Sequence, residues 1–442
     1  MTPNHLQVGV GRTDITPPLG TLLMGYPTPD RAAESVRDPL HATALAFEYA
    51  GVTAVILSLD VAIVEDEHVA AIRNGIQDKT GVQPGHITVC AIQTHSAPRT
   101  QEVWGWCELD GEYIDNTMVP GAISAATDAH NAKVPARVGI ATTRSDVGIN
   151  RRPIRADHGI ALGQSRWGYY DPEMTVLRFE SVEGTLATVV HYGAHPTVLG
   201  SWSRAISRDW PCIMIDGIER YSGAPALFIN GAVGDIAPRS QSLGATGQDE
   251  DHLLEVGHTA LRDAMKAWRS IRDLRDINMS VSTGNYELTY RPLPPLQEAK
   301  TEQRNAEPDK GKYGRGMAEY KYWSAVIEAH KAAPRSGRPF LQTITQLGPV
   351  AIVPFPGEPF AETVLRMRDV SPFQHTLCAS TSCGNNAYLC PREAYARGGY
   401  EAWVGRALGA YLLAENIDDI LVQENLSLLE QAFTHAYPAL PA

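Results

Sequence analysis

Short apolar runs rich in β-branched residues most restrict what this chain can fold into. Each run ends at once at a polar residue or a proline. Continuous apolar runs of this kind are typical of strands that are buried on both faces of a sheet. Five such runs predict core strands, at residues 53–64, 87–92, 186–190, 225–229 and 350–353.

Helical periodicity separates these strands. In residues 66–81, Val69, Ile72 and Ile76 share one face, and Gly81 stands where a C-cap is expected. Pro211 can open another helix, and residues 250–271 carry one apolar stripe. By contrast, residues 342–354 predict a β-hairpin around a glycine turn. The expected fold class is therefore α/β, with a mixed β-sheet core flanked by helices.

The domain organisation predicted from the sequence is a single catalytic domain over residues 1–442. Residues 293–340 are richer in charge and proline, with one helical stretch near 316–332, and are interpreted as a surface insertion. The C-terminal residues predict helices that end in a Pro-containing tail.

Composition argues against several classes of partner. The formal net charge is −12, and no basic stripe is present, which disfavours nucleic acid and anionic membrane surfaces. No apolar run reaches the ~18 residues that a membrane span needs. The N-terminus lacks the features of a secretion signal, and the six cysteines are expected to be reduced thiols. We therefore expect a cytoplasmic protein whose partner is a small-molecule substrate. The sequence is also compatible with a homo-oligomer.

Polar clusters follow four of the strands at the point where each strand ends. Ligands of open α/β sheets bind beyond the carboxyl ends of strands. Histidines and a carboxylate on separate strand exits are the minimal set for a catalytic zinc site, although a strand-end histidine more often only satisfies hydrogen bonds. His191 and His195 have helical spacing, but Gly193 and Pro196 disfavour a helix there. One of the two histidines is therefore expected to bind metal and the other to be structural.

Two loops concentrate aromatic residues. Trp104 and Trp106 lie within residues 98–115, and Trp167 and two tyrosines lie within 164–171. A lid that stacks against the substrate and ordinary packing of long loops explain this pattern equally well. The sequence leaves both interpretations open.

A series of short motifs runs along most of the chain in a fixed order. They lie at residues 8–17, 24–26, 38–40, 94–98, 150–152, 193–196, 230–235, 356–358, 388 and 399–401. Together they resemble the neutral ceramidase family of zinc-dependent amidases. Many motifs in one order are specific for the superfamily and much less specific for the substrate.

This resemblance implies a zinc ion held by two histidines, one glutamate and one tyrosine. Three of these positions correspond to His195, Glu358 and Tyr388. The fourth departs from the family motif His-Thr-His-Ser-Gly-Pro, because Gln93 stands where its first histidine is expected. An amide oxygen is a poorer zinc ligand than imidazole. Zinc held with Gln93, zinc held by a shifted His95, and a weakened or absent metal site all stay open.

The resemblance also implies catalytic groups. His95 matches the second histidine of that motif, which faces the substrate, and Arg151 and Tyr400 match residues that contact the reacting amide or its oxyanion. Ala237 stands where the family has its proposed serine nucleophile, so covalent serine catalysis is excluded there. A metal-activated water is compatible with this change. The expected substrate-binding residues are Trp104, Trp106 and Asp235.

The expected function is a zinc-dependent hydrolase of a small polar amide, lactone or ester that uses a metal-activated water. Ceramide is disfavoured, because no signal sequence, no interfacial segment and no C-terminal immunoglobulin-like domain is expected. The changes at Gln93 and Ala237 leave open a non-hydrolytic isomerase or lyase that acts on a sugar or polyol. A non-catalytic ligand-binding descendant is the third alternative, and metal content would separate it from the hydrolase.

Overall fold

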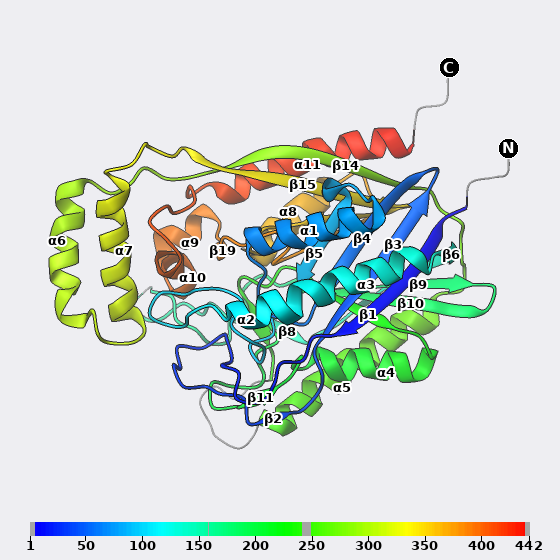
Figure 1. The fold of residues 1–442 in the computed structure, drawn as a ribbon, viewed down its shortest axis with the longest axis horizontal. Coiled ribbons are helices and arrows are strands. Elements are labelled where there is room, and N and C mark those ends of the chain that lie inside the picture. The colour runs from blue at the N-terminus through cyan, green and yellow to red at the C-terminus, as the bar shows by residue number, and fades with distance from the viewer. Residues whose placement is uncertain (1–4, 158, 241–248, 438–442) are drawn as a thin grey trace.

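Three mixed sheets and the helices that cover them make up the described part of the protein (Figure 1). The structure is a computed structural model, and it describes residues 5–157, 159–240 and 249–437. Residues 1–4 bear on the predicted absence of a secretion signal, and residues 438–442 on the predicted Pro-containing tail; both lie outside the described residues.

The N-terminal sheet has the strand order β5-β4-β3-β1-β6. Strands β4 and β5 run parallel, while β1 is antiparallel to both β3 and β6. Helices α1 and α3 cover one face of this sheet (Figure 1). The elements are β1 (Gln7–Asp14), β3 (His41–Tyr49), β4 (Val52–Leu59), β5 (Ile87–Ala91), β6 (Val134–Pro135), α1 (Asp66–Thr80) and α3 (Val119–Asn131), which α2 (Gly111–Tyr113) and a π-helical turn (Ile114–Met118) precede.

The second sheet has the order β12-β10-β9-β7, and helices α4 and α5 pack on it. Its bounds are β7 (Arg137–Arg144), β9 (Glu173–Ser181), β10 (Gly184–Tyr192), β12 (Ala226–Asn230), α4 (Pro211–Ser222) and α5 (Asp249–Ser270). The third sheet has the order β14-β15-β16-β18 beneath helices α8 and α11. Its bounds are β14 (Met279–Thr289), β15 (Gly337–Leu347), β16 (Val350–Pro354), β18 (His375–Ala379), α8 (Ala361–Val370) and α11 (Ile417–Ala436).

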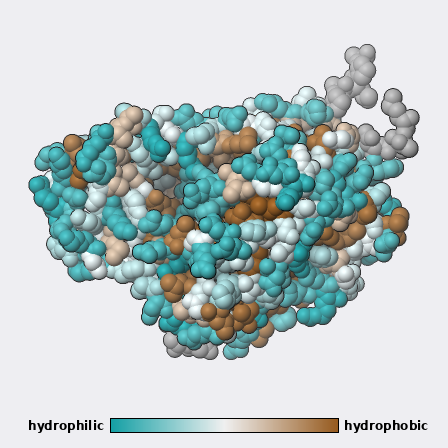
Figure 2. All heavy atoms as spheres, viewed as in Figure 1, coloured by the Kyte–Doolittle hydropathy of each residue, from teal (hydrophilic) through white to brown (hydrophobic). Residues whose placement is uncertain are grey.

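Short elements connect these layers around the site. The three two-stranded pairs are β2 (Ser35–Val36) with β11 (Ala205–Ile206), β8 (Gly148–Asn150) with β13 (Ile236–Pro238), and β17 (Glu358–Pro359) with β19 (Tyr388–Leu389). Helices α6 (Leu296–Ala306) and α7 (Arg315–Ala329) form a hairpin at one end of the molecule, beside α9 (Arg392–Arg397) and α10 (Tyr400–Val404) (Figure 1). Hydrophilic side chains cover most of that end in Figure 2.

One buried apolar cluster joins the three sheets. Phe47 of β3 packs against Phe179 of β9, with ring centroids 5.5 Å apart, and Ile352 of β16 belongs to the same cluster. Because each sheet contributes side chains to this core, the carboxyl ends of β5, β10, β12 and β16 are held in fixed positions. The polar residues that follow these strands are therefore fixed as well.

The predicted core strands and the hairpin are confirmed by β4, β5, β10, β12, β15 and β16. The predicted C-cap is also confirmed, since Gly81 ends α1 with φ 76° and its N–H donates to Gln77 O. The insertion at 293–340 contains α6 in addition to the one predicted helix, and the single-domain interpretation stays a prediction.

All six cysteines are buried and unpaired. None of the helices in the described ranges is long and apolar enough to cross a membrane.

Candidate active site

A pair of two-residue strands brings Glu358 beside Tyr388. Strands β17 and β19 run parallel, and these two residues are partners in the register. Gly357 permits this approach: a Cβ there would lie 2.5 Å from the carbonyl oxygen of Ala387. Only glycine fits such a close contact between backbones.

His195 lies in the loop after β10, and its orientation is set by the backbone. Its Nδ1 is 2.9 Å from the carbonyl oxygen of Ile236, which can only accept, so Nδ1 carries the hydrogen. The Trp210 indole donates to the carbonyl oxygen of His195 at 3.1 Å. Nε2 of His195 therefore points its lone pair toward Glu358, whose Oε2 is 3.0 Å away.

Gln93 and His95 follow β5, and Gln93 contacts the same carboxylate. Gln93 has φ 69°, and its Nε2 donates to Glu358 Oε1 at 2.7 Å. The His95 ring contacts Tyr26 and His195 edge-on, with centroids 5.1 and 5.8 Å apart. Burial, aided by the nearby His195 and arginines, lowers the pKa of His95 well below its usual value, so this imidazole is neutral.

Arg151 is held against the site by a fully buried carboxylate. Its Nε donates to Glu401 Oε1 at 2.9 Å and its Nη2 to the carbonyl oxygen of Gly234 at 2.8 Å. Its Nη1 is 3.4 Å from each ring nitrogen of His195. Burial disfavours the charge, but Tyr388 and the carboxylates nearby outweigh it and raise the pKa of Arg151. The guanidinium is therefore a permanent cation beside the carboxylate of Glu358.

Six of the ten predicted site residues line one cavity of about 60 Å³. They are Gln93, His95, Trp106, Glu358, Tyr388 and Tyr400. The rings of Trp106 and Tyr400 stack with centroids 5.8 Å apart and an interplanar angle of 15°, which forms one wall. Burial raises the pKa values of Tyr388 and Tyr400, so both phenols stay protonated and can donate. His195 and Arg151 support this cavity through Glu358 and Tyr388.

The structure does not bring Trp104 and Asp235 into this cavity lining. Trp104 packs with apolar residues between α7 and α10, and Asp235 accepts hydrogen bonds from Asn150 Nδ2 (2.7 Å) and the backbone N–H of Ala361 (2.8 Å). Substrate binding through Trp104 or Asp235 stays a prediction. The second aromatic loop is also outside the lining, with Trp167 97% exposed.

Sequence reasoning left the roles of several supporting residues unassigned. His191 takes a structural position, because its Nε2 lies 2.7 Å from the carbonyl oxygen of Cys378. Glu401 stands inside a recognised motif, but no local pattern shows that it pairs with Arg151. Gly25 lies directly against His95: a Cβ there would be 2.4 Å from the imidazole ring. These contacts join segments far apart in the chain, so spacing carries no signal for them.

The donor atoms at this site fit a divalent metal ion. The lone pair of His195 Nε2 and Glu358 Oε2 face each other at 3.0 Å in a buried position, so a proton or a cation must neutralise them. Glu358 Oε2 and Gln93 Oε1 are also buried without a hydrogen-bond partner among the described residues. In that same part of the chain no group of three His, Cys, Asp or Glu residues converges, so a metal site here would depend on Gln93 or Tyr388 as a further ligand.

Comparison with known families decides where the chain belongs. The sequence model described as neutral/alkaline non-lysosomal ceramidase, N-terminal, matches residues 6–253, more than half of the chain. The chain belongs to the neutral/alkaline non-lysosomal ceramidase family. No curated protein sequence matches it at a significant level.

Solved ceramidase structures share the fold of this ceramidase-family chain. Neutral ceramidase from Pseudomonas aeruginosa matches with a TM-score of 0.72 and 16% identity, over 97% of this chain and 75% of that one. A structure described as ceramidase complexed with C2 matches with a TM-score of 0.76 and 16% identity, over 99% of this chain and 77% of the other. The likeness confirms the predicted α/β fold class.

Membership of the ceramidase family makes this protein a hydrolase at the level of the family. The matched region ends at residue 253 and includes Gln93, His95, Arg151 and His195. Glu358, Tyr388 and Tyr400 lie beyond it. Their place beside the N-terminal residues comes from the tertiary structure, and their catalytic roles stay predictions.

Proposed function

We propose that this ceramidase-family protein is a metal-dependent hydrolase that acts on a small polar amide, lactone or ester and not on ceramide. One observation carries the proposal: His95, Glu358, Tyr388 and Tyr400, from separate segments of the chain, line a single cavity. They combine a neutral imidazole, a carboxylate and two phenols beside a buried guanidinium. These are the groups that acyl-transfer chemistry requires.

The size of the cavity supports a small reacting group. Its volume is about 60 Å³, whereas pockets that enclose drug-sized ligands measure roughly 300–1,000 Å³. Trp106 and Tyr400 close one side by stacking on each other. A cavity of this volume cannot by itself enclose a long acyl chain.

His195, Glu358, Tyr388 and Gln93 are the residues that would hold the metal, with zinc as the family-level candidate. When bound, a divalent ion supplies Lewis acidity to a carbonyl oxygen and lowers the pKa of a water molecule. Because Gln93 offers an amide oxygen in place of imidazole, we expect zinc to bind less tightly than at a site with two histidines.

The chain's own residues orient and stabilise the reacting group. Arg151 and the hydroxyl of Tyr400 would donate hydrogen bonds to the oxygen on which negative charge develops, which elsewhere contributes a few kcal/mol per donor. His95 Nδ1 is buried without a hydrogen-bond partner in the described residues, so it is free to form a hydrogen bond with the substrate. The stacked aromatic pair would exclude water.

Metal content and turnover test the proposal together. We expect about one divalent ion per chain by inductively coupled plasma mass spectrometry, and hydrolysis of at least one member of a panel of small amides, lactones and esters. Glu358→Gln should lower metal affinity by at least about tenfold and abolish turnover. Glu362→Gln, on the exposed face of α8, is the matched control. A protein that stays metal-free in zinc, or a Glu358→Gln variant with unchanged metal and turnover, would refute the proposal.

We extend the proposal to a cytoplasmic protein that binds neither nucleic acid nor membranes, with a small molecule as its partner. The net charge of −12 supports the absence of binding to nucleic acid and to anionic membranes. Six unpaired cysteines support a reducing compartment.

A further inference from the structure

A second, larger cavity adjoins the candidate active site. It has a volume of about 240 Å³ and shares five lining residues with the smaller cavity. The shared residues are Gln101, Asn385, Ala387, Tyr388 and Leu408. Since Tyr388 lines both spaces, a ligand whose reacting end lies beside Glu358 has its other end directed toward the larger cavity.

Asn385 presents an unused hydrogen-bond donor to this cavity. The residue is 6% exposed, and its Oδ1 accepts from the backbone N–H of Ala387 at 3.1 Å. That contact fixes the amide orientation and leaves Nδ2 on the other side. Nδ2 is buried and has no partner within the described residues. A buried donor without a partner is costly, so a ligand atom that accepts a hydrogen bond from Nδ2 would be favoured here.

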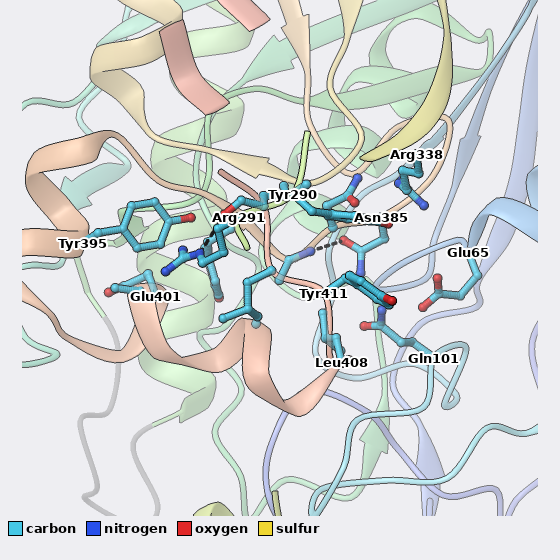
Figure 3. Close-up of a pocket in the computed structure, with 18 of the residues that line it drawn as sticks. Glu65, Gln101, Tyr290, Arg291, Arg338, Asn385, Tyr395, Glu401, Leu408 and Tyr411 are labelled. Atoms are coloured by element: carbon cyan, nitrogen blue, oxygen red, sulfur yellow. Dashed lines mark hydrogen bonds between the residues drawn. The ribbon is translucent and has the colours of Figure 1, made fainter. Parts of the chain in front are cut away.

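Charged groups of both signs stand at the same end of the cavity. Glu65, Gln101, Asn385 and Arg338 lie near one another in Figure 3. Arg338 forms an ion pair with Asp66 through Nη1, but its Nε is buried without a partner among the residues described. The cavity thus offers donors from Asn385 and Arg338 and an acceptor from Glu65.

Tyrosine rings supply the remaining walls. Tyr290 and Tyr411 stack with centroids 5.2 Å apart and an interplanar angle of 30°, and Tyr395 lies further along the same cavity (Figure 3). Such rings offer an apolar face together with a hydroxyl. A ligand with C–H groups on one side could pack against the ring faces, and hydroxyls on its edges could form hydrogen bonds with the tyrosine hydroxyls.

We propose that the larger cavity binds a polyhydroxylated part of the substrate, so that the scissile amide, lactone or ester belongs to a sugar-derived or polyol-derived molecule. A hydroxyl group both donates and accepts, so neighbouring hydroxyls can meet Asn385, Arg338 and Glu65 together. This inference rests on the proposed hydrolase function and specifies its substrate class.

Two amides of equal carbon number test the inference. D-gluconamide carries five hydroxyl groups, and hexanamide carries none. Binding to the full-length chain is measured by isothermal titration calorimetry at pH 8, where Glu65, with a pKa of about 7, is ionised. Release of ammonia from each amide is measured separately. We expect D-gluconamide to bind at least about tenfold more tightly than hexanamide.

Asn385→Asp is the decisive variant. It keeps Oδ1 for the N–H of Ala387, but it replaces the unpartnered donor by an acceptor and adds a negative charge in the cavity that Glu65 also lines, so binding of D-gluconamide should fall at least about tenfold while hexanamide is unaffected. Asn305→Asp, on the exposed surface of α6, is the matched control. If Asn385→Asp fails to fold, Glu65→Gln replaces it and should weaken binding of D-gluconamide in the same way. Glu67→Gln, 77% exposed in the first turn of α1, is then the control.

The outcomes separate this inference from the proposed function. Equal affinity for the two amides, no binding of D-gluconamide, or unchanged binding by folded Asn385→Asp would overturn the inference. Hydrolysis of hexanamide at the same kcat/KM as D-gluconamide would overturn the inference but support the hydrolase. Selective binding of D-gluconamide, lost in Asn385→Asp, with no metal and no hydrolysis of any substrate, would support the cavity assignment and refute the hydrolase.

Discussion

Glu401→Gln removes the buried charge that holds two arginines at the site. The carboxylate of Glu401 is fully buried, accepts from Arg151 Nε at 2.9 Å and forms a second ion pair with Arg152. Glutamine has the same shape, so the substitution opens no cavity. Its amide offers one acceptor oxygen and turns an NH₂ group toward a guanidinium, so one charged hydrogen bond is lost and one is weakened.

The expected loss of unfolding free energy depends on the hydrogen bonds that each arginine retains. Arg151 keeps the carbonyl oxygen of Gly234 at 2.8 Å, and Arg152 keeps that of Gly398 at 2.8 Å. Both guanidinium groups stay largely buried and lose the charge of Glu401, and breaking a buried ion pair in this way costs about 3–5 kcal/mol of unfolding free energy. Turnover should fall as well, because Arg151 is no longer held beside His195.

Urea denaturation at pH 7 measures the change in unfolding free energy. The control is Glu328→Gln, which breaks an exposed ion pair with Lys331 (2.7 Å; side chains 68% and 66% exposed) and should cost only about 0–1 kcal/mol. If Glu401→Gln costs no more than this control, the carboxylate does not neutralise the two arginines, and the reasoning fails.

Two further predictions concern metal affinity and pH. Gln93→His should raise zinc affinity at least about tenfold, measured by competition with a chromophoric chelator; unchanged affinity would mean that position 93 does not face the metal. Burial raises the pKa of Glu65 from its usual 4.5 to about 7, so the native state holds this proton longer than the unfolded chain does. Its contribution to stability is complete below pH 4.5 and is lost as the pH rises to 7. Glu65→Gln should therefore gain up to about 3 kcal/mol over wild type between pH 4.5 and 8, by urea denaturation, while Glu67→Gln should gain nothing.

Five strands with continuous apolar side chains were predictable, and the half-buried strand β14 was not. Strand β12 is buried at every position, so its apolar character follows directly from burial. Strand β14 alternates between half-buried and exposed positions over residues 282–287 and contains serine, threonine and glycine. Its place in the third sheet depends on antiparallel pairing with β15 along its whole length. Pairing of this kind leaves little hydrophobic signal in a single sequence.

The candidate site also has a part that was predictable from the sequence and a part that was not. Motifs in the sequence pointed to Gln93, His95 and Glu358, and the structure places all three at one cavity. The partners that hold the site came only from the structure, as in the contact between Arg151 and Glu401. That contact joins residues 250 positions apart.

The sequence by itself determined which segments become buried strands and helices and which residue types follow each strand, because burial and turn geometry act on neighbouring residues. Tertiary structure alone decided that two-residue strands set Glu358 beside Tyr388, and that residues as distant as Glu65 and Tyr411 line a second cavity. Periodicity reports only which face of an element is buried, whereas a site is made by the packing of elements against one another.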